Sequence, residues 1–249
     1  WRARVAEPQE MVHWIRGWGP DVEVLAPEAL RAQLIGEARQ MAVLYDLQPV
    51  PTYQLLWAKT SRDRRLTHPL ICHLIDVAEM TRALWNQALT KSTRTQFSKY
   101  LGLAPEATGR LISFWAGLHD VGKASPCFQR KYKPAIADLE EAGLPFPRRF
   151  VQAACYHGVI SARTLSHLLE KEVRMPKRLA APVARAVGGH HGAWPHPRDL
   201  EALHSTDLGD TEWAAIRGEL LATLHDLYDP PVVRELGRTQ QEINTLVTL

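Results

Sequence analysis

The sequence predicts an all-α domain preceded by a small α/β fragment. Beyond residue 50, apolar residues recur at every third or fourth position, the spacing of one helix face, and strand-like alternation is nearly absent. Pro49 and Pro51 interrupt the pattern, so we expect a boundary near residue 50. Of the 249 residues, 45% are apolar and 23% are charged, which is typical of globular domains and excludes a disordered or collagen-like chain.

The first 46 residues are expected to form a short strand followed by a helix. The segment 22–25 reads Val-Glu-Val-Leu, an alternation typical of a strand. Pro27 and Glu28 suit the first turn of a helix, which continues with one apolar face to Tyr45. A unit this small buries little apolar surface by itself, so it requires the rest of a missing domain or a partner surface.

Six helices are expected after residue 50, joined by short loops. Glycines mark helix ends, and Asp210 and Thr239 are residue types that cap helix starts. The expected ranges are 69–89, 106–121, 150–172, 178–191, 210–227 and 239–249.

The net charge of +3 permits nucleic-acid binding without requiring it. The three cysteines, Cys72, Cys127 and Cys155, are odd in number, far apart and without a C-x-x-C motif, so we expect reduced core thiols in a cytoplasmic protein. No stretch approaches the roughly 18 apolar residues of a membrane span, so no membrane association is expected. Because the chain starts with Trp1 and stops inside an apolar pattern, both ends look cut.

Histidines and one aspartate gather on otherwise apolar segments. Taken singly, each of these residues more often has a structural role than a metal-binding one. His119 and Asp120 would then lie at a polar helix end, and His73 and His157 would be hydrogen-bonded core histidines. The pair His190 and His191 would lie in an exposed loop. Together the segments offer five imidazoles and one carboxylate, too many polar groups for one core and about the number that two divalent ions sharing Asp120 need.

The donor types indicate the metal and the chemistry. Imidazole-rich sites favour Mn, Fe, Co, Ni or Zn over Mg or Ca. Two such ions about 4 Å apart can clamp a phosphodiester and activate water for its hydrolysis. Lys123, one helical turn after His119, could hold a phosphate oxygen, although a solvated surface lysine is equally compatible with the sequence.

These motifs, in this order, resemble the HD phosphohydrolase superfamily. They read H-x-x-x-D-V-A from His73, L-H-D-V-G-K around Asp120, H-G-x-x-S-A from His157 and G-H-H-G around His190. The segments LWAKTS and HDVGKASPCFQRKY are similar to the HD nuclease domain of the CRISPR-associated helicase–nuclease of type I systems, over about residues 53–249.

The resemblance implies an HD-superfamily helical domain over residues 51–249 with two divalent transition-metal ions. One ion would take His73, His119 and Asp120, and the second would share Asp120 and take His157, His190 and His191. Asp120, His119 and Lys123 would be the catalytic residues. The substrate would be single-stranded DNA, fed by an SF2 helicase in the full-length protein, and the partner would be a Cascade-type RNA-guided surveillance complex.

The family carries one further ligand aspartate on a later helix, and no matching context occurs here. Asp207 and Asp210 fall in an expected loop, and Asp226 and Asp229 in a polar turn. We therefore expect the domain to be truncated before that aspartate and before the helicase. It should hold the second metal firmly and the first weakly or not at all.

Residues 1–50 have a different likeness. WIRGWGPDVEVLAPEALRAQLIGEARQMAVLY looks like the C-terminal end of WYL-domain transcriptional regulators, which implies the tail of a regulator fused to the nuclease. An amphipathic helix that packs on the nuclease explains the segment equally well.

The segment after the HD motif is the best candidate for strand binding. Phe128, Arg130, Lys131 and Tyr132 combine positive charge with aromatic rings, as single-strand binding sites do, although an ordinary solvated face is the alternative. Two other functions remain open: an HD-type nucleotide or cyclic-nucleotide phosphohydrolase, and a regulatory module driven by the N-terminal piece.

Overall fold

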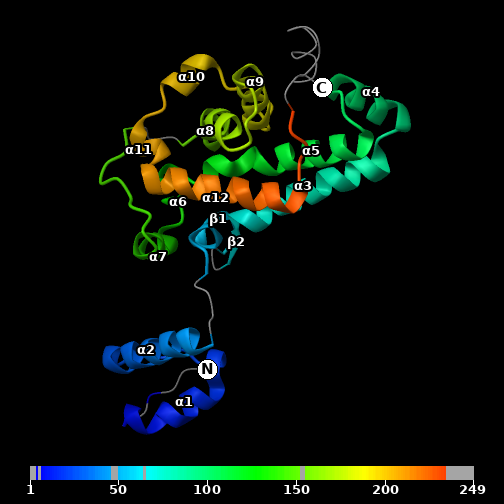
Figure 1. Cartoon of the computed structure of the whole chain (residues 1–249). Coiled ribbons are helices and arrows are strands. Elements are labelled where there is room, and N and C mark those ends of the chain that lie inside the picture. The colour runs from blue at the N-terminus through cyan, green and yellow to red at the C-terminus, as the bar shows by residue number, and fades with distance from the viewer. Residues whose placement is uncertain (1–3, 5–6, 46–49, 64–65, 152–154, 234–249) are drawn as a thin grey trace. The chain divides into compact units, whose positions relative to one another are not determined.

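The computed structural model divides into two compact units, Trp1–Val50 and Pro51–Leu249 (Figure 1). It describes residues 4, 7–45, 50–63, 66–151 and 155–233. The last helix expected from the sequence, 239–249, lies outside these ranges. No helix in the described ranges is long and apolar enough to cross a membrane.

The N-terminal unit is built on two helices, α1 (Val12–Trp18) and α2 (Glu28–Leu44), with the 3-10 turns η1 (Pro8–Met11) and η2 (Gly19–Asp21). Val12 and Leu30 are buried, and an ion pair between Arg16 and Glu37 joins the two helices. The strand expected at 22–25 is not formed in the described part of this unit. Val22 has extended backbone, but a strand needs a hydrogen-bonded neighbour and this short unit offers none.

The larger unit is helical, as the sequence predicts. Its longer helices are α3 (Leu70–Ala83), α4 (Lys91–Leu101), α5 (Pro105–Gly117), α8 (His157–Lys171), α9 (Lys177–Gly188) and α12 (Thr211–Tyr228). Short helices connect them: α6 (Pro126–Gln129), α7 (Ile136–Glu141), α10 (Pro197–Glu201) and α11 (Ser205–Leu208), with the 3-10 turns η3 (Thr52–Leu55), η5 (Leu118–Lys123) and η6 (Lys133–Ala135).

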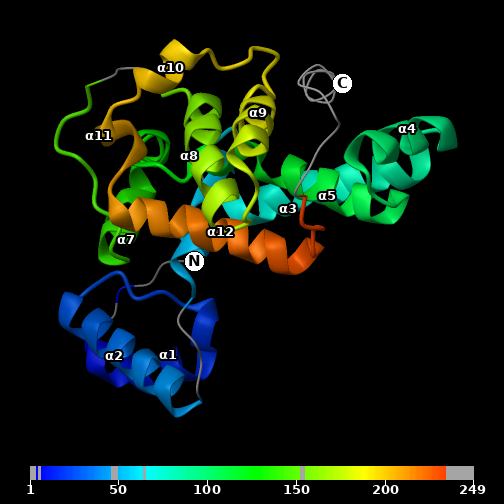
Figure 2. The same cartoon turned by 45° about the horizontal axis from the view of Figure 1, so that its top comes forward.

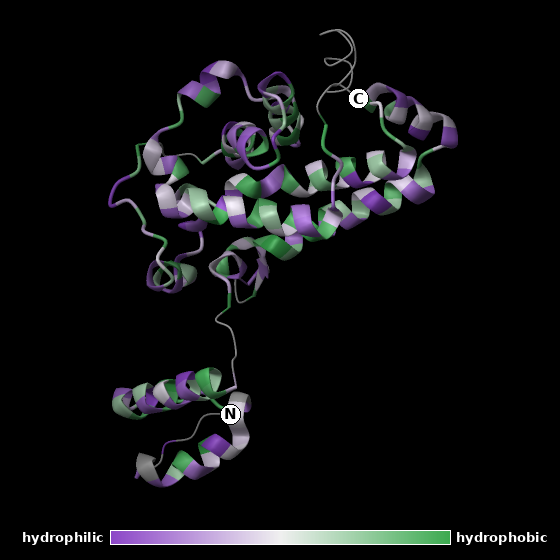
Figure 3. Cartoon of the chain, in the orientation of Figure 1, coloured by the Kyte–Doolittle hydropathy of each residue, from purple (hydrophilic) through white to green (hydrophobic). Residues whose placement is uncertain are grey.

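Two layers of helices enclose the core. Helices α3, α5 and α12 lie side by side in both views, and α8 packs against α9 and η5 (Figures 1 and 2). Hydrophobic and hydrophilic residues alternate along α3, α5 and α12, as expected for helices with one buried face (Figure 3). Leu74, Phe114, Leu118 and Trp213 are among the fully buried side chains.

A small antiparallel hairpin was not expected from the sequence. Strands β1 (Trp57–Thr60) and β2 (Thr67–Pro69) pair with Lys59 opposite His68. Segments of three and four residues are too short for their alternation to stand out from an apolar run.

Several helix ends differ from expectation. Helix α3, which was expected over 69–89, passes into a π-helical stretch, η4 (Leu84–Ala88). The helix expected from residue 150 begins at His157. Helix α4 was missed because its sequence, KSTRTQFSKYL, is largely polar. It begins after Thr90, whose hydroxyl accepts a hydrogen bond from the Thr93 amide.

The expectation of three reduced core cysteines is wrong. Cys127 and Cys155 form a disulfide, with their α-carbons 5.7 Å apart, and Cys72 is free but exposed. Only the fold brings residues 28 positions apart into contact, so an odd number of cysteines without a C-x-x-C motif could not reveal the pair.

Candidate metal centre

Asp120 is the centre of the cluster. It lies in η5 and is 3% exposed. His73 donates a 2.8 Å hydrogen bond to its Oδ2 atom, and His119 Nε2 lies 3.1 Å from the same oxygen. On the other side, the Nε2 atoms of His157 and His190 lie 3.0 and 3.2 Å from Oδ1. One carboxylate therefore contacts four imidazoles from separate segments of the chain.

Two of these imidazoles have a fixed tautomer. His119 Nδ1 lies 2.9 Å from the carbonyl oxygen of Ala116, and His190 Nδ1 lies 3.0 Å from that of Val187. Because a carbonyl oxygen can only accept, each Nδ1–H must donate, and the neutral ring presents its Nε2 lone pair to Asp120. A lone pair facing a carboxylate is unfavourable unless a proton or a cation lies between them.

The electrostatics of Asp120 fit a cation site. Burial raises the pKa of this carboxyl, but the four surrounding imidazoles lower it more, so that its pKa lies well below the usual range. Its buried Oδ1 atom has no well-aligned hydrogen-bond partner among the described residues. An ionised, incompletely satisfied carboxylate among imidazole nitrogens is a donor set that suits a divalent transition metal.

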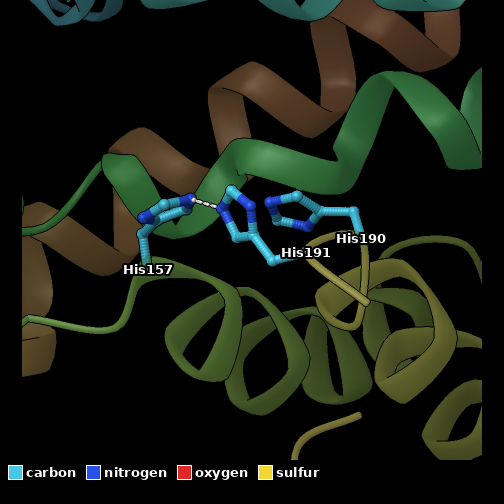
Figure 4. A group of neighbouring side chains, drawn as sticks. All are labelled: His157, His190 and His191. Carbon is cyan, nitrogen blue, oxygen red and sulfur yellow. Dashed lines mark hydrogen bonds between the residues drawn. The ribbon is translucent and has the colours of Figure 1, made fainter. Parts of the chain in front are cut away.

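The potential ligands fall into two groups. His73, His119 and Asp120 form one, and His157, His190 and His191 form the other, with ligand atoms in each group within 4.8 Å of one another. Figure 4 shows His191 between His157 and His190, with its Nε2 atom 2.9 Å from that of His157. Desolvation, then the nearby imidazoles of His190 and His157, lowers the pKa of His191 and so favours the neutral ring that can bind a metal.

Lys123 belongs to the same site. Its side chain is buried, its Nζ atom lies 2.7 Å from Asp120 Oδ2, and it donates a 3.2 Å hydrogen bond to the carbonyl of Ala58 in β1. Lys123 is therefore not the solvated surface lysine that the sequence left open as an alternative. The ammonium group is held at the edge of the carboxylate that both ligand groups approach.

A glycine lets the two motif segments touch. A β-carbon at Gly122 would lie 2.1 Å from the His157 carbonyl oxygen and 2.5 Å from the Ser161 amide nitrogen. The Gly122 amide donates a 2.9 Å hydrogen bond to the Ser161 hydroxyl. Helix α8 thus packs directly on the backbone beside Asp120, which sets the distance between His157 and the carboxylate.

A second close approach joins α8 and α9. A β-carbon at Gly188 would lie 2.4 Å from the Gly158 carbonyl oxygen, and one at Gly158 would lie 2.5 Å from that of Gly188. Because neither Gly158 nor Gly188 has a side chain, the start of α8 packs directly on the end of α9, which leads into the loop that carries His190 and His191.

The sequence reasoning missed Gln129, which fastens the motif loop to the hairpin. Its fully buried amide donates 2.9 Å hydrogen bonds to the carbonyls of Trp57 and Lys123 and accepts one of 3.2 Å from the Trp57 amide. Arg217 on α12 holds the same loop by a 2.7 Å hydrogen bond to the Ala124 carbonyl. Glutamine has no motif signal of its own, so only the contacts reveal this role.

The four residues proposed for strand binding have unequal access to solvent. Phe128 is 6% exposed and packs on Trp57 and His157, with ring centroids 4.7 and 5.5 Å away, so a base cannot stack on it. Lys131 is exposed, and Arg130 and Tyr132 are partly exposed. The guanidinium of Arg130 lies 3.8 Å from the centroid of the Phe150 ring. Of the four residues, Arg130, Lys131 and Tyr132 are therefore accessible to a strand, and Phe128 is not.

The aspartates considered as extra ligands do not join either group. Asp226 and Asp229 are exposed, and Asp229 ends α12, where its carbonyl accepts a hydrogen bond from Arg110. Asp207 is buried and caps α11 by accepting a bond from the His204 amide. Asp210 is exposed at the start of α12. In the described ranges, the carboxylate of the two ligand groups is Asp120.

Comparisons with known proteins agree with this geometry. Residues 57–248 match the family model described as Cas3, HD domain, and residues 1–42 match that of the WCX domain, consistent with the WYL-like sequence there. The CRISPR-associated endonuclease/helicase Cas3 of Thermus thermophilus is 36% identical over 137 residues, which are 55% of this chain and 14% of that protein. The chain therefore spans about one seventh of that relative.

Solved structures give the same result. The crystal structure of a CRISPR-associated protein aligns with a TM-score of 0.69 and 32% identity, covering 80% of this chain and 23% of that one. The Thermus thermophilus cas3 HD domain, solved in the presence of Ni²⁺, aligns with a TM-score of 0.55 and 25% identity, covering 80% and 74% of the two chains. The family model matches well over half of the sequence, and the chain belongs to the family of Cas3 HD domains.

Proposed function

We propose that this domain is a metal-dependent nuclease that hydrolyses phosphodiester bonds of single-stranded DNA in type I CRISPR interference. The observation that carries the proposal is one buried carboxylate in contact with four imidazoles and an ammonium group. Membership in a family whose relative is named an endonuclease/helicase supports the same activity.

The residues fit two divalent transition-metal ions. His73, His119 and Asp120 would hold one, and His157, His190 and His191, with the shared Asp120, would hold the other. When bound, such ions supply Lewis-acid activation of water and neutralise charge on the phosphodiester. The structure of the Thermus thermophilus cas3 HD domain was solved in the presence of Ni²⁺, a metal that suits an imidazole-rich donor set.

The protein side chains orient rather than react. The Ala116 and Val187 carbonyls fix the rings of His119 and His190, so that their Nε2 atoms face the centre without rearrangement. Lys123 provides a fixed positive charge next to Asp120, suited to a nonbridging phosphate oxygen. The lowered pKa of Asp120 keeps its carboxylate ionised, so it would be available to either ion.

The two metal positions are expected to differ in affinity. Counting the shared Asp120 with each, the His157 group offers four ligand side chains and the His73 group offers three. Fewer protein ligands give weaker binding and more solvent on the ion. A calorimetric titration with Ni²⁺ should show one tight and one weak equivalent, and two equally tight equivalents would contradict the assignment.

A cleavage assay tests the activity and separates it from its alternative. Purified protein should cut circular single-stranded DNA, faster than blunt duplex, with Mn²⁺, Co²⁺ or Ni²⁺ supporting more activity than Ca²⁺. Hydrolysis of mononucleotides or cyclic nucleotides without cutting of the circle would instead identify a nucleotide phosphohydrolase.

The domain boundary and the partners of this domain are also proposals. We place the boundary between a regulator-like N-terminal piece and the nuclease near residue 50. In the full-length protein an SF2 helicase would deliver the single strand, and a Cascade-type surveillance complex would select the target. The Thermus thermophilus relative is named an endonuclease/helicase, which supports the first of these partners.

A further inference from the structure

Two exposed aromatic side chains stand out in the larger unit. Of the Phe, Trp and Tyr residues in its described ranges, only Tyr156, at 64%, and Trp194, at 43%, have highly exposed side chains. All the others are buried or partly buried. Neither ring makes an aromatic contact or a side-chain hydrogen bond with the described residues. Tyrosine and tryptophan are enriched in binding interfaces, because each joins a large apolar ring to a polar group.

Both residues flank the second ligand group in the sequence. Tyr156 directly precedes His157, and Trp194 follows His191 by three positions, while the Nε2 atoms of these two histidines are 2.9 Å apart. The two rings therefore belong to the two chain segments that meet at this histidine pair (Figure 4 shows the pair).

The backbone at each ring is anchored, although the ring itself has no partner among the residues that the structure describes. The Tyr156 carbonyl accepts hydrogen bonds from the Val159 and Ile160 amides at 3.0 and 3.1 Å, in the first turn of α8. Beside Trp194, the Pro195 carbonyl accepts a 3.1 Å hydrogen bond from Arg185 of α9. A ring on fixed backbone loses little conformational freedom when a ligand stacks on it.

Positive charge lies close to Tyr156. The Nζ atom of Lys131 is 3.5 Å from the carbonyl oxygen of Cys155, the residue before Tyr156. Desolvation, then the charges of Arg130 and Lys123, lowers the pKa of Lys131, so its protonated state would gain from a nearby anion. Phosphate-binding cations with aromatic stacking surfaces are the usual elements of a single-strand binding site.

We propose that Tyr156 and Trp194 are base-stacking platforms on the two chain segments that meet at the His157–His191 pair, with Lys131 holding the strand's phosphate next to Tyr156. This inference rests on the proposed function and adds the residues that grip the strand at the second ligand group. Stacking does not distinguish bases, because every base has a π face, so the grip suits a nuclease that cuts regardless of sequence.

Binding of a fluorescein-labelled 12-nucleotide thymidine strand to the full chain in EDTA tests the proposal, since the strand is then bound but not cut. Tyr156→Ala and Trp194→Ala should each weaken binding about tenfold, the loss expected for one stacked base. Tyr156→Phe and Trp194→Phe keep a ring and should bind as the wild type does. Trp14→Ala, at a 63% exposed tryptophan of the other unit, is the control and should change nothing.

A strand with abasic sugars separates stacking from a general structural effect. The wild type should bind it more weakly than the normal strand, and the alanine variants should bind both equally. In turnover with Mn²⁺, the alanine variants should show a raised KM with kcat little changed, and unchanged Ni²⁺ content should show that the fold and site are intact.

Different results would overturn the stacking proposal and the proposed function. A wild type that binds and cuts the strand, with alanine variants that bind it equally well, overturns the stacking proposal alone and leaves the rings for a protein partner. A wild type that neither binds nor cuts a single strand overturns the proposed function, and the stacking proposal with it.

Discussion

Gly122 and His157 touch backbone to backbone, so closely that a β-carbon at Gly122 would lie 2.1 Å from the His157 carbonyl oxygen. The contact joins the segment that carries Asp120 to the first turn of α8. The distance between the two ligand groups therefore depends on the absence of a side chain at this position.

Gly122→Ala should accordingly separate the groups. The methyl group must push α8 away from η5, which we expect to cost about 3 kcal/mol of folding free energy and to weaken Ni²⁺ binding. Thermal unfolding and calorimetric titration measure the two effects. Gly218→Ala is the control, since a β-carbon there meets nothing within 4 Å and a helical alanine should stabilise the protein by about 0.5–1 kcal/mol.

Asp120→Asn should remove both metals at once and reduce cleavage of single-stranded DNA to background, because the neutral amide no longer offers a charged bridging ligand. It also leaves the buried Lys123 ammonium without its carboxylate, which we expect to cost about 3–5 kcal/mol. The double variant with Lys123→Met should recover much of that stability without recovering metal. Retained cleavage by purified Asp120→Asn would refute the two-metal proposal.

Gln129→Leu should destabilise the larger unit by about 3 kcal/mol, since it leaves three buried backbone groups without partners. Chemical denaturation measures the loss. Gln96→Leu is the matched control: Gln96 is exposed, its amide bonds only the Tyr100 hydroxyl at 3.3 Å, and its loss should stay within about 0.5 kcal/mol. Equal effects of the two changes would show that the amide of Gln129 does not hold the loop.

Deletion of residues 1–46 should leave metal content and cleavage intact, because every proposed ligand lies at or beyond His73. Metal analysis and the circular single-strand assay of the shortened chain test this. Loss of bound Ni²⁺ would mean that the N-terminal piece is part of the nuclease fold, against a boundary near residue 50.

The pair of Arg16 and Glu37 should make the N-terminal unit sensitive to acid. Hydrogen bonds from Arg16 and then Gln33 lower the pKa of Glu37 to about 2 from an ordinary 4.5. A carboxyl with a lowered folded-state pKa stabilises the fold above its unfolded value, and this contribution is lost as pH falls from about 4.5 to about 2. A carboxyl-carbon NMR titration should show the low pKa, and Arg16→Ala should raise the pKa of Glu37 toward its ordinary value while the Gln33 hydrogen bond still lowers it.

The helical class and the site cluster could be predicted because the sequence carries their signals locally. Apolar spacing fixes the faces of α3, α5 and α12, and the unusual density of histidines points to one centre around Asp120. Helix α8 begins at His157, seven residues after the start that the sequence predicts, since the apolar residues Phe150 and Val151 continue the helical spacing in the sequence.

What could not be predicted depends on contacts between distant residues. Nothing near Gln129 in the sequence shows that its amide meets Trp57, and nothing near Phe128 shows that its ring is covered by Trp57 and His157. Aromatic and basic residues side by side suggested a binding surface, whereas packing buries the ring and leaves the cations outside.

The Cys127–Cys155 disulfide closes a covalent ring that contains α7 and the loop that follows it. His73, His119 and Asp120 precede this ring, and His157, His190 and His191 follow it. A protease that cuts once between residues 128 and 154 would separate the chain into a fragment with the first ligand group and a fragment with the second. The cut protein would nevertheless migrate as one molecule on a denaturing gel and would split into two bands only after a thiol reductant is added.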